Sequence, residues 1–313
     1  MERNIERRNG FLVLDGYKHE LADEDKCQYW INIRGCECYF KPVISLTGAY
    51  NELIAYHSAK LLGIDCAFYD LAIFNGEIGV ISPNIGPHDK KLVTAEEILN
   101  EYLSVAFEEL KHELIKKAQV EVSKGICVDD INNLEVIEKA LEYRYGKTYG
   151  SDALKKLMVQ TIKRFLFALV LNDTDKRPEN YMYIEGESVE AAAMIDNEQI
   201  LMAYKQFSLT TNFKDSYSNM ATVLKEFLNK YHKDYLKVLE DMLATITAGF
   251  EKVIIEVESQ IGQKLPDNYK ETIRRRLKEN TQEIKNTIEW FCARTKITGV
   301  YKPKKKVRYK KTA

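Results

Sequence analysis

The residues best suited to chemistry lie in Leu169–Ile184, LVLNDTDKRPENYMYI, where an apolar helical pattern runs into a polar loop. In this loop Asp175 precedes Asn180 by five residues, and a strand pattern follows at once. This spacing suits phosphoryl transfer, because the carboxylate can orient an attacking hydroxyl while the amide oxygen holds a metal ion. The alternative is an ordinary turn with Asx hydrogen bonds, which the same residue types favour.

A second candidate lies sixteen residues beyond Asn180, where the apolar run Met194–Ile195 ends at Asp196. A carboxylate at this point would be a second oxygen ligand of the kind that Mg²⁺ prefers alongside phosphate oxygens. Taken alone, Asp196 also fits a turn at the end of a strand.

The N-terminal part supplies a candidate cation and its partner. Lys41 ends a predicted hairpin strand, and Glu52 follows eleven residues later at the start of a predicted helix. Protein kinases use a strand lysine paired with a helix glutamate to place an ammonium group against the α- and β-phosphates of ATP. Each residue has a simpler interpretation: Lys41 as an edge-strand lysine, and Glu52 as a first-turn acid favoured by the helix dipole. The order Lys, Glu, Asp, Asn, Asp along the chain favours the kinase interpretation.

The elements that must position these residues fall into two regions. Residues 1–87 are predicted to form a sheet-rich lobe with one helix, which Gly63 ends. Turn signals at Arg34-Gly35 and Asn75-Gly76 predict hairpins. The predicted elements are strands at Phe11–Leu14, Tyr29–Ile33, Glu37–Phe40, Ala67–Phe74 and Gly79–Ser82, and a helix at Tyr50–Leu62.

Residues 88–295 are predicted to form a larger helical lobe, followed by a basic tail over residues 296–313. Thr94 and Glu97 form a capping box that opens the first helix. The predicted helices are Ala95–Val122, Asn132–Arg144, Ala153–Leu171, Asn219–Tyr231, Tyr235–Gln260 and Asn268–Cys292, with short strands at Tyr181–Ile184 and Ala192–Ile195. The fold class is therefore α+β, with a small antiparallel-sheet lobe and a large, mainly helical lobe.

The chain resembles the HipA-like and CtkA-like bacterial serine/threonine kinases, which share a phosphatidylinositol-kinase-like fold. The resemblance lies in FKP at Phe40–Pro42, in the helix segment Asn51–Ile64, in NDTDKRPEN at Asn172–Asn180, and in MID at Met194–Asp196. It implies a two-lobed, protein-kinase-like architecture that uses ATP and Mg²⁺.

The resemblance also implies residue roles. Lys41 would contact the ATP phosphates and Glu52 would brace it, while Asp175 would be the catalytic base. Asn180 and Asp196 would bind Mg²⁺, and the strand Ile78–Pro83, with Ile81 and Ser82, would form the hinge beside adenine. Arg177 stands where the family usually has histidine, and its guanidinium could neutralise a transferring phosphate. The phosphate-covering loop departs from the family pattern: it is not glycine-rich, and Asp15–Lys26 contains no Ser or Thr.

Charge and composition narrow the remaining function classes. The net charge is −1, but residues 296–313 hold eight Lys or Arg and no acid, leaving 38 basic and 47 acidic residues in 1–295. Such a tail is either solvated or a contact for an anionic surface or nucleic acid, and no nucleic-acid recognition fold accompanies it.

The six cysteines lack zinc-site spacing. Without an apolar run of 18 residues or a signal-peptide core, we expect no membrane span and a cytoplasmic location.

The sequence therefore predicts an ATP- and Mg²⁺-dependent kinase that phosphorylates a hydroxyl, Ser or Thr of a protein substrate. Two alternatives stay open: a small-molecule phosphotransferase on a similar scaffold, and a catalytically weak kinase-like module that senses nucleotide or binds a partner. An antitoxin-like regulatory partner is compatible with the resemblance.

Overall fold

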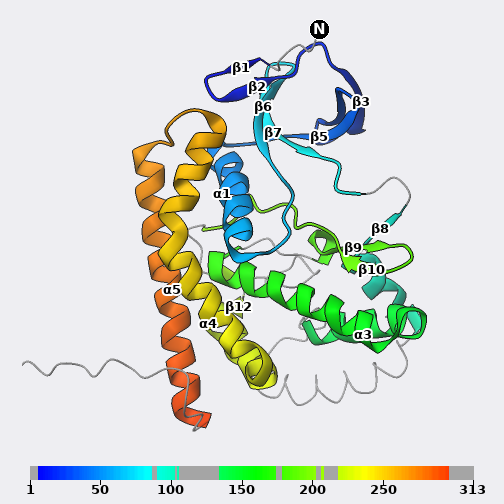
Figure 1. Cartoon of the computed structure of the whole chain (residues 1–313), viewed down its shortest axis with the longest axis vertical. Helices are drawn as coiled ribbons and strands as arrows, with labels where there is room; N and C mark the ends of the chain where they lie inside the picture. Colours follow the sequence, from blue (N-terminus) through cyan, green and yellow to red (C-terminus); the bar gives the residue numbers. More distant parts are fainter. Residues whose placement is uncertain are drawn as a thin grey trace, which may run out of the picture.

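A computed structural model gives the fold of the chain (Figure 1). It describes residues 6–86, 90–102, 104–105, 134–173, 178–201, 206–207 and 218–295. Two residues with predicted roles, Asp175 and Arg177, lie outside the described residues, as does the basic tail.

The first part of the chain forms a seven-stranded sheet in the order β1-β2-β6-β7-β5-β4-β3. Neighbouring strands in this sheet are antiparallel, as predicted for this lobe, except for β2 and β6, which run parallel. A parallel pair needs a crossover connection, and the chain between β2 and β6 supplies one. The strands are β1 (Arg7–Arg8), β2 (Phe11–Val13), β3 (Lys18–Asp23), β4 (Gln28–Ile33), β5 (Cys36–Pro42), β6 (Asp70–Phe74) and β7 (Glu77–Pro83).

Both predicted hairpin turns are confirmed. Arg34 and Gly35 have φ of 57° and 86°, and Asn75 and Gly76 have φ of 52° and 80°. Two consecutive residues with positive φ match the right-handed twist of the flanking strands.

The edge strand β3 was not predicted, because its side chains are mostly charged or polar and nearly all exposed. Charged side chains on an edge strand discourage pairing with other chains.

The two faces of this sheet have different neighbours. One face carries a separate apolar cluster, which includes Ile31 of β4, Phe40 of β5 and Ile81 of β7. Because side chains alternate along a strand, Trp30, Tyr39 and Lys41 project from the opposite face. This opposite face is turned toward the rest of the molecule.

Helix α1 (Leu46–Leu62) begins four residues earlier than predicted. The Oγ of Ser45 accepts a hydrogen bond from the backbone N–H of Gly48 and so caps the helix. The predicted end is confirmed, because Gly63 adopts φ 65° and its N–H bonds to the last turn. As a consequence Glu52 lies in the second turn, so its interpretation as a first-turn acid is wrong.

The remaining helices differ from the prediction where the structure describes them; most of the predicted helix Ala95–Val122 lies outside the described residues. The predicted helix at residue 95 begins there, capped by the Thr94 Oγ1, which accepts a hydrogen bond from the Glu97 N–H. Two predicted helices correspond to α3 (Leu134–Leu171), which is interrupted at Gly150 with φ 78°. The predicted break at residues 232–234 is wrong: this stretch has no Gly or Pro to end a helix, and α4 (Met220–Ile261) is continuous. Helix α5 (Asp267–Thr295) follows.

A small antiparallel sheet, in the order β10-β9-β8, lies beside α3. The predicted strand Ala192–Ile195 is wrong, because the tight turn after β9 places residues 189–191 opposite it instead. Met194 forms only an isolated parallel bridge with Cys66. The small elements are β8 (Lys91–Thr94), the 3₁₀ turn η2 (Pro178–Asn180), β9 (Met182–Glu185), β10 (Val189–Ala191), β11 (Gln206–Phe207) and β12 (Ser218–Asn219).

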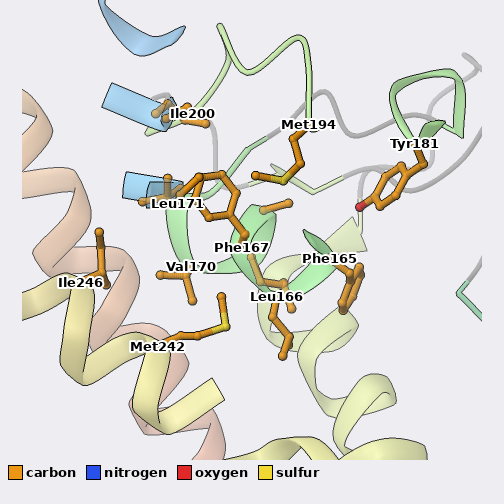
Figure 2. Packing of buried hydrophobic residues seen from close by; sticks show 14 of the residues in the cluster. Phe165, Leu166, Phe167, Val170, Leu171, Tyr181, Met194, Ile200, Met242 and Ile246 are labelled. Carbon is orange, nitrogen blue, oxygen red and sulfur yellow. The ribbon is translucent and has the colours of Figure 1, made fainter. Parts of the chain in front are cut away.

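Figure 1 shows α4 and α5 as a long antiparallel pair, with α1 between this pair and the large sheet. One apolar cluster joins α1, α3, α4 and α5. Figure 2 shows part of this cluster: Val170 of α3 lies toward Met242 and Ile246 of α4, whereas Phe167 points to the side of Leu171 and Met194. Among the described helices, none combines the length and the hydropathy needed to cross a bilayer.

Candidate functional site

Lys41 lies at the centre of a group of three carboxylates, and together these four residues come from three parts of the chain. Its Nζ is 2.5 Å from Oδ1 of Asp196, 3.1 Å from Oε2 of Glu198 and 3.8 Å from Oε1 of Glu52. Lys41 belongs to β5, Glu52 to α1, and the other two to the loop after Met194. Three of the residues singled out in the sequence are therefore in direct contact.

Helix α1 fixes the backbone of the loop that carries Asp196. Glu52 is fully buried, and its Oε2 accepts a hydrogen bond from the backbone N–H of Asn197 at 2.8 Å. The backbone N–H of Asp196 donates to the hydroxyl of Tyr69 at 3.3 Å. Asp196 has φ 56°, a left-handed conformation that Asp tolerates better than most residues. These bonds hold its carboxylate toward Lys41.

The electrostatics keep the Lys41 side chain charged. Burial alone would lower the pKa of Lys41, but the carboxylates of Asp196, Glu52 and Glu198 outweigh that effect, and the net pKa is raised. Burial, assisted by Glu52, raises the pKa of Tyr69 well above its usual value. The Tyr69 hydroxyl therefore stays neutral beside the carboxylates.

The carboxylates form a group with the geometry of a cation site. One oxygen from each of Glu52, Asp196 and Glu198 lies within 4.8 Å of the others, and such oxygens suit Mg²⁺. Glu198 was missed by the sequence reasoning. The signal was present in the run Asp196-Asn197-Glu198, where two acids flank a residue that turns out to be buried.

Asn180 ends η2 and is buried, and Tyr181 separates it from the strand β9. The backbone N–H of Tyr181 donates to Pro178 O, and its carbonyl accepts from the N–H of Ala95. These backbone hydrogen bonds fix the position of the turn that carries Asn180, five residues after Asp175 in the sequence. Its predicted role as a metal ligand beside Asp196 stays a prediction.

The two predicted hinge residues lie on opposite faces of β7. Ile81 packs into the apolar cluster on the far side of the sheet, so any contact with a nucleotide would use its backbone. Ser82 pairs with Tyr39 of β5 and therefore shares the Lys41 face. Its Oγ donates to the carbonyl of Pro83.

An aromatic pair on the Lys41 face was not singled out from the sequence. Trp30 and Tyr39 are cross-strand partners in β4 and β5, with ring centroids 4.8 Å apart. The Tyr39 hydroxyl donates to Oε1 of Gln28. The pair lies two residues from Lys41 along β5, so a nucleotide whose phosphates reach Lys41 could place its base against these rings.

A cavity of 710 Å³ adjoins Lys41 between the β3–β4 turn and the start of α1. Its lining includes Lys26 from the turn, Ser45 and Gly48 from the start of α1, and Glu198. Lys26, Lys41 and the N-terminal end of α1 attract negatively charged groups, and the carboxylates of Asp25 and Glu198 offset part of that positive charge. The cavity is large enough for a phosphate chain and part of an acceptor.

Comparison with known proteins rests on structure alone. No protein-family model matches the sequence, and no curated protein matches it. The chain is similar to the proinflammatory kinase CtkA of Helicobacter pylori, with a TM-score of 0.60 and 14% identity, covering 90% of this chain and 99% of CtkA.

It is also similar to HipA of the Shewanella oneidensis toxin–antitoxin system, in a structure that also holds HipB and operator DNA. That TM-score is 0.51 at 14% identity, and the match covers 91% of this chain and 69% of HipA. The chain has a CtkA/HipA-like fold, which confirms the predicted resemblance and fold class.

Proposed function

We propose that this protein is an ATP- and Mg²⁺-dependent kinase that transfers the γ-phosphate to a hydroxyl, Ser or Thr of a protein. The observation that carries this proposal is the contact of Lys41 with both Glu52 and Asp196. It joins a sheet lysine, a helix glutamate and a loop aspartate, which are charged residues that protein kinases use in phosphoryl transfer. The kinase-like fold supports the same conclusion.

In this proposal Lys41 offsets negative charge on the nucleotide phosphates, and Glu52 keeps its ammonium group in place. Trp30 and Tyr39 bind the base by stacking, with Ser82 at the edge of the same face. Asp175 orients the attacking hydroxyl, and Arg177 neutralises the transferring phosphate. Positioning and electrostatic stabilisation supply most of the rate in such reactions.

Asp196 and Asn180 would hold Mg²⁺, which supplies positive charge to the phosphates when bound. The oxygens of Glu52, Asp196 and Glu198 lie close enough together to fit a divalent cation. Lys41 now provides the positive charge among these carboxylates. We therefore expect its contact with Asp196 to loosen when metal and nucleotide bind.

The direct test combines turnover with binding. The protein has two tryptophans, so a Trp290→Phe background reports from Trp30 alone. We expect Mg-ATP to quench the Trp30 fluorescence, and ATP consumption or added phosphate to appear by mass spectrometry. Asp196→Asn should lower turnover about 100-fold or more, whereas Asp241→Asn, on the exposed side of α4, should not change it.

The other outcomes separate the alternatives. Quenching without turnover or added phosphate, with protein substrates and metabolites both supplied, would favour a nucleotide-sensing module. Phosphate found on a metabolite and never on protein would favour a small-molecule phosphotransferase. The absence of both quenching and turnover would reject the kinase function. The cytoplasmic location and the antitoxin-like partner remain predictions, the latter supported by the occurrence of HipB with HipA.

A further inference from the structure

Three polar side chains on one face of α5 contact the segments that form the candidate site. Tyr269, Arg276 and Asn280 are separated by seven and four residues, a spacing that places them on the same side of a helix. None of them was singled out in the sequence for this role. Their contacts reach both the end of α3 and the loop that carries Asp196.

Asn280 completes the hydrogen bonding at the end of α3. The last four carbonyls of a helix have no partner within it. The Nδ2 of Asn280 donates to the carbonyl of Leu169 at 3.0 Å and to that of Val170 at 2.6 Å. The side chain of Asn280 is buried, so water is a poor substitute for these bonds.

The neighbouring carbonyls are satisfied by the backbone where the chain leaves α3. The N–H of Asp173 donates to Ala168 O at 2.8 Å, and the N–H of Leu201 donates to Leu171 O at 2.7 Å. The Leu169 carbonyl, one of the two that Asn280 contacts, also accepts from the N–H of Asn172 at 3.2 Å. Asn172 adopts φ 49°, which turns the chain away from the helix axis. The bond from Leu201 also ties the end of the Asp196 loop to the end of α3.

Arg276 and Tyr269 hold the Asp196 loop from the other side. The Nη1 of Arg276 donates to the carbonyl of Leu201 at 2.7 Å. The hydroxyl of Tyr269 donates to Oδ1 of Asn51 in α1 at 2.9 Å. The amide of Asn51 in turn donates to the carbonyls of Glu198 and Ile200 at 2.7 and 3.1 Å.

We propose that this face of α5 is the positioning element of the site, and that Asn280 is its principal residue. It fixes the exit of α3, which leads to Asp175 and Asn180, relative to the loop that carries Asp196. The proposal rests on the kinase function proposed above. Because Trp30 and Lys41 belong to the large sheet, loss of Asn280 should impair turnover and leave nucleotide binding unchanged.

The test replaces Asn280 by leucine, which has a similar size and no donor. The matched control is Ile284→Ala, one turn further along α5, which removes buried packing and none of these hydrogen bonds. Conditions are chosen so that both variants are fully folded. The readouts are kcat, KM for ATP, Trp30 quenching, and amide hydrogen exchange of Asp173 and Leu201.

We expect Asn280→Leu to lower kcat at least tenfold with the KM for ATP within twofold, and to speed exchange at Asp173 and Leu201 at least tenfold. Ile284→Ala should change kcat and both exchange rates less than threefold. Asn280→Gln, which keeps the amide, should recover part of kcat. Equal effects of Asn280→Leu and Ile284→Ala on kcat and exchange would overturn the proposal.

The exchange measurement separates this proposal from the kinase function. If the wild type shows no turnover, the kinase function fails, and the exchange rates alone decide whether α5 fixes the two segments. If turnover is present and Asn280→Leu changes neither kcat nor exchange, the positioning role fails while the kinase function stands.

Discussion

At the scale of single residues, the positive charge of Lys41 offsets the mutual repulsion of three neighbouring carboxylates. The carboxylate of Glu52 has no solvent exposure, and Asp196 and Glu198 are only partly exposed. Charges removed from water need a partner or a metal ion. The same lysine therefore serves stability in the protein without ligands and, in our proposal, catalysis with them.

We expect Lys41→Met to lower turnover about 100-fold and the free energy of unfolding by about 2 kcal/mol, because the three carboxylates lose their counter-charge. The variant should also respond more strongly to Mg²⁺ than the wild type, with a larger rise in Tm. Thermal unfolding with and without Mg²⁺ at about 10 mM measures the loss of stability and the response to Mg²⁺, and ATP consumption measures the turnover.

The control for this prediction is Lys237→Met, which removes a lysine from an exposed pair with Asp241 on α4. Its Tm and its response to Mg²⁺ should match those of the wild type. A Lys41→Met variant with unchanged Tm and an unchanged Mg²⁺ response would contradict the balancing role of Lys41.

At the scale of elements, α1 connects the sheet to the helical part through polar side chains. Glu52 and Asn51 hold the Asp196 loop. One turn further, Nε2 of His57 lies 2.7 Å from Oε1 of Gln260 on α4, and the Gln260 amide donates to the carbonyl of Tyr69. The helix is therefore fixed on two sides by buried and partly buried hydrogen bonds.

This arrangement predicts a pH dependence for the α1–α4 contact. Burial lowers the pKa of His57, although Gln260 and Glu256 partly oppose this. The folded state then binds the proton less tightly than the unfolded chain, so stability is lost as pH falls below the usual histidine pKa of about 6.5. Below the lowered pKa of the folded state, this contribution of His57 to the stability is absent.

His57→Gln keeps a polar side chain and removes the titration. We expect the Tm advantage of the wild type over this variant to be smaller at acid pH than at neutral pH, as measured by thermal unfolding in matched buffers. The same difference in Tm at both pH values would show that His57 does not couple α1 to pH.

At the scale of the whole molecule, the predicted lobes share one apolar core. The cluster that contains Leu53 and Ile54 of α1 continues into Leu166 and Phe167 of α3 and Ile246 of α4. A core shared in this way favours unfolding as one unit, because neither part can expose its surface without disturbing the other. The domain boundary predicted at residue 87 stays a prediction.

We therefore expect a single cooperative transition for residues 6–295. In the Trp290→Phe background, the unfolding midpoint from far-UV circular dichroism, which reports mainly the helices, should equal the midpoint from Trp30 fluorescence, which reports the sheet. Two separated midpoints would contradict the shared core. Mg-ATP should shift both probes together, because a ligand that binds only the folded state stabilises the whole cooperative unit.

Much of the fold follows from local signals that the sequence carries openly. The turns at Arg34-Gly35 and Asn75-Gly76 need residues that tolerate positive φ, and Gly63 ends α1 for the same reason. One kind of error occurs where a partner in another segment decides the conformation. Residues 192–195 had the apolar composition of a strand, yet the partner of β9 is Val189–Ala191.

For the site, the sequence alone determined which residue types stand in which order: Lys41, Glu52, Asp175, Asn180 and Asp196. Only the tertiary structure brought Lys41 within 2.5 Å of Asp196, 155 residues later, and added Glu198, Trp30 and the α5 face. The physical reason is that order and composition are local, whereas charge pairing, stacking and the capping of α3 by Asn280 depend on packing between distant segments. A buried asparagine in a long amphipathic helix carries no local signal of the carbonyls that it will meet.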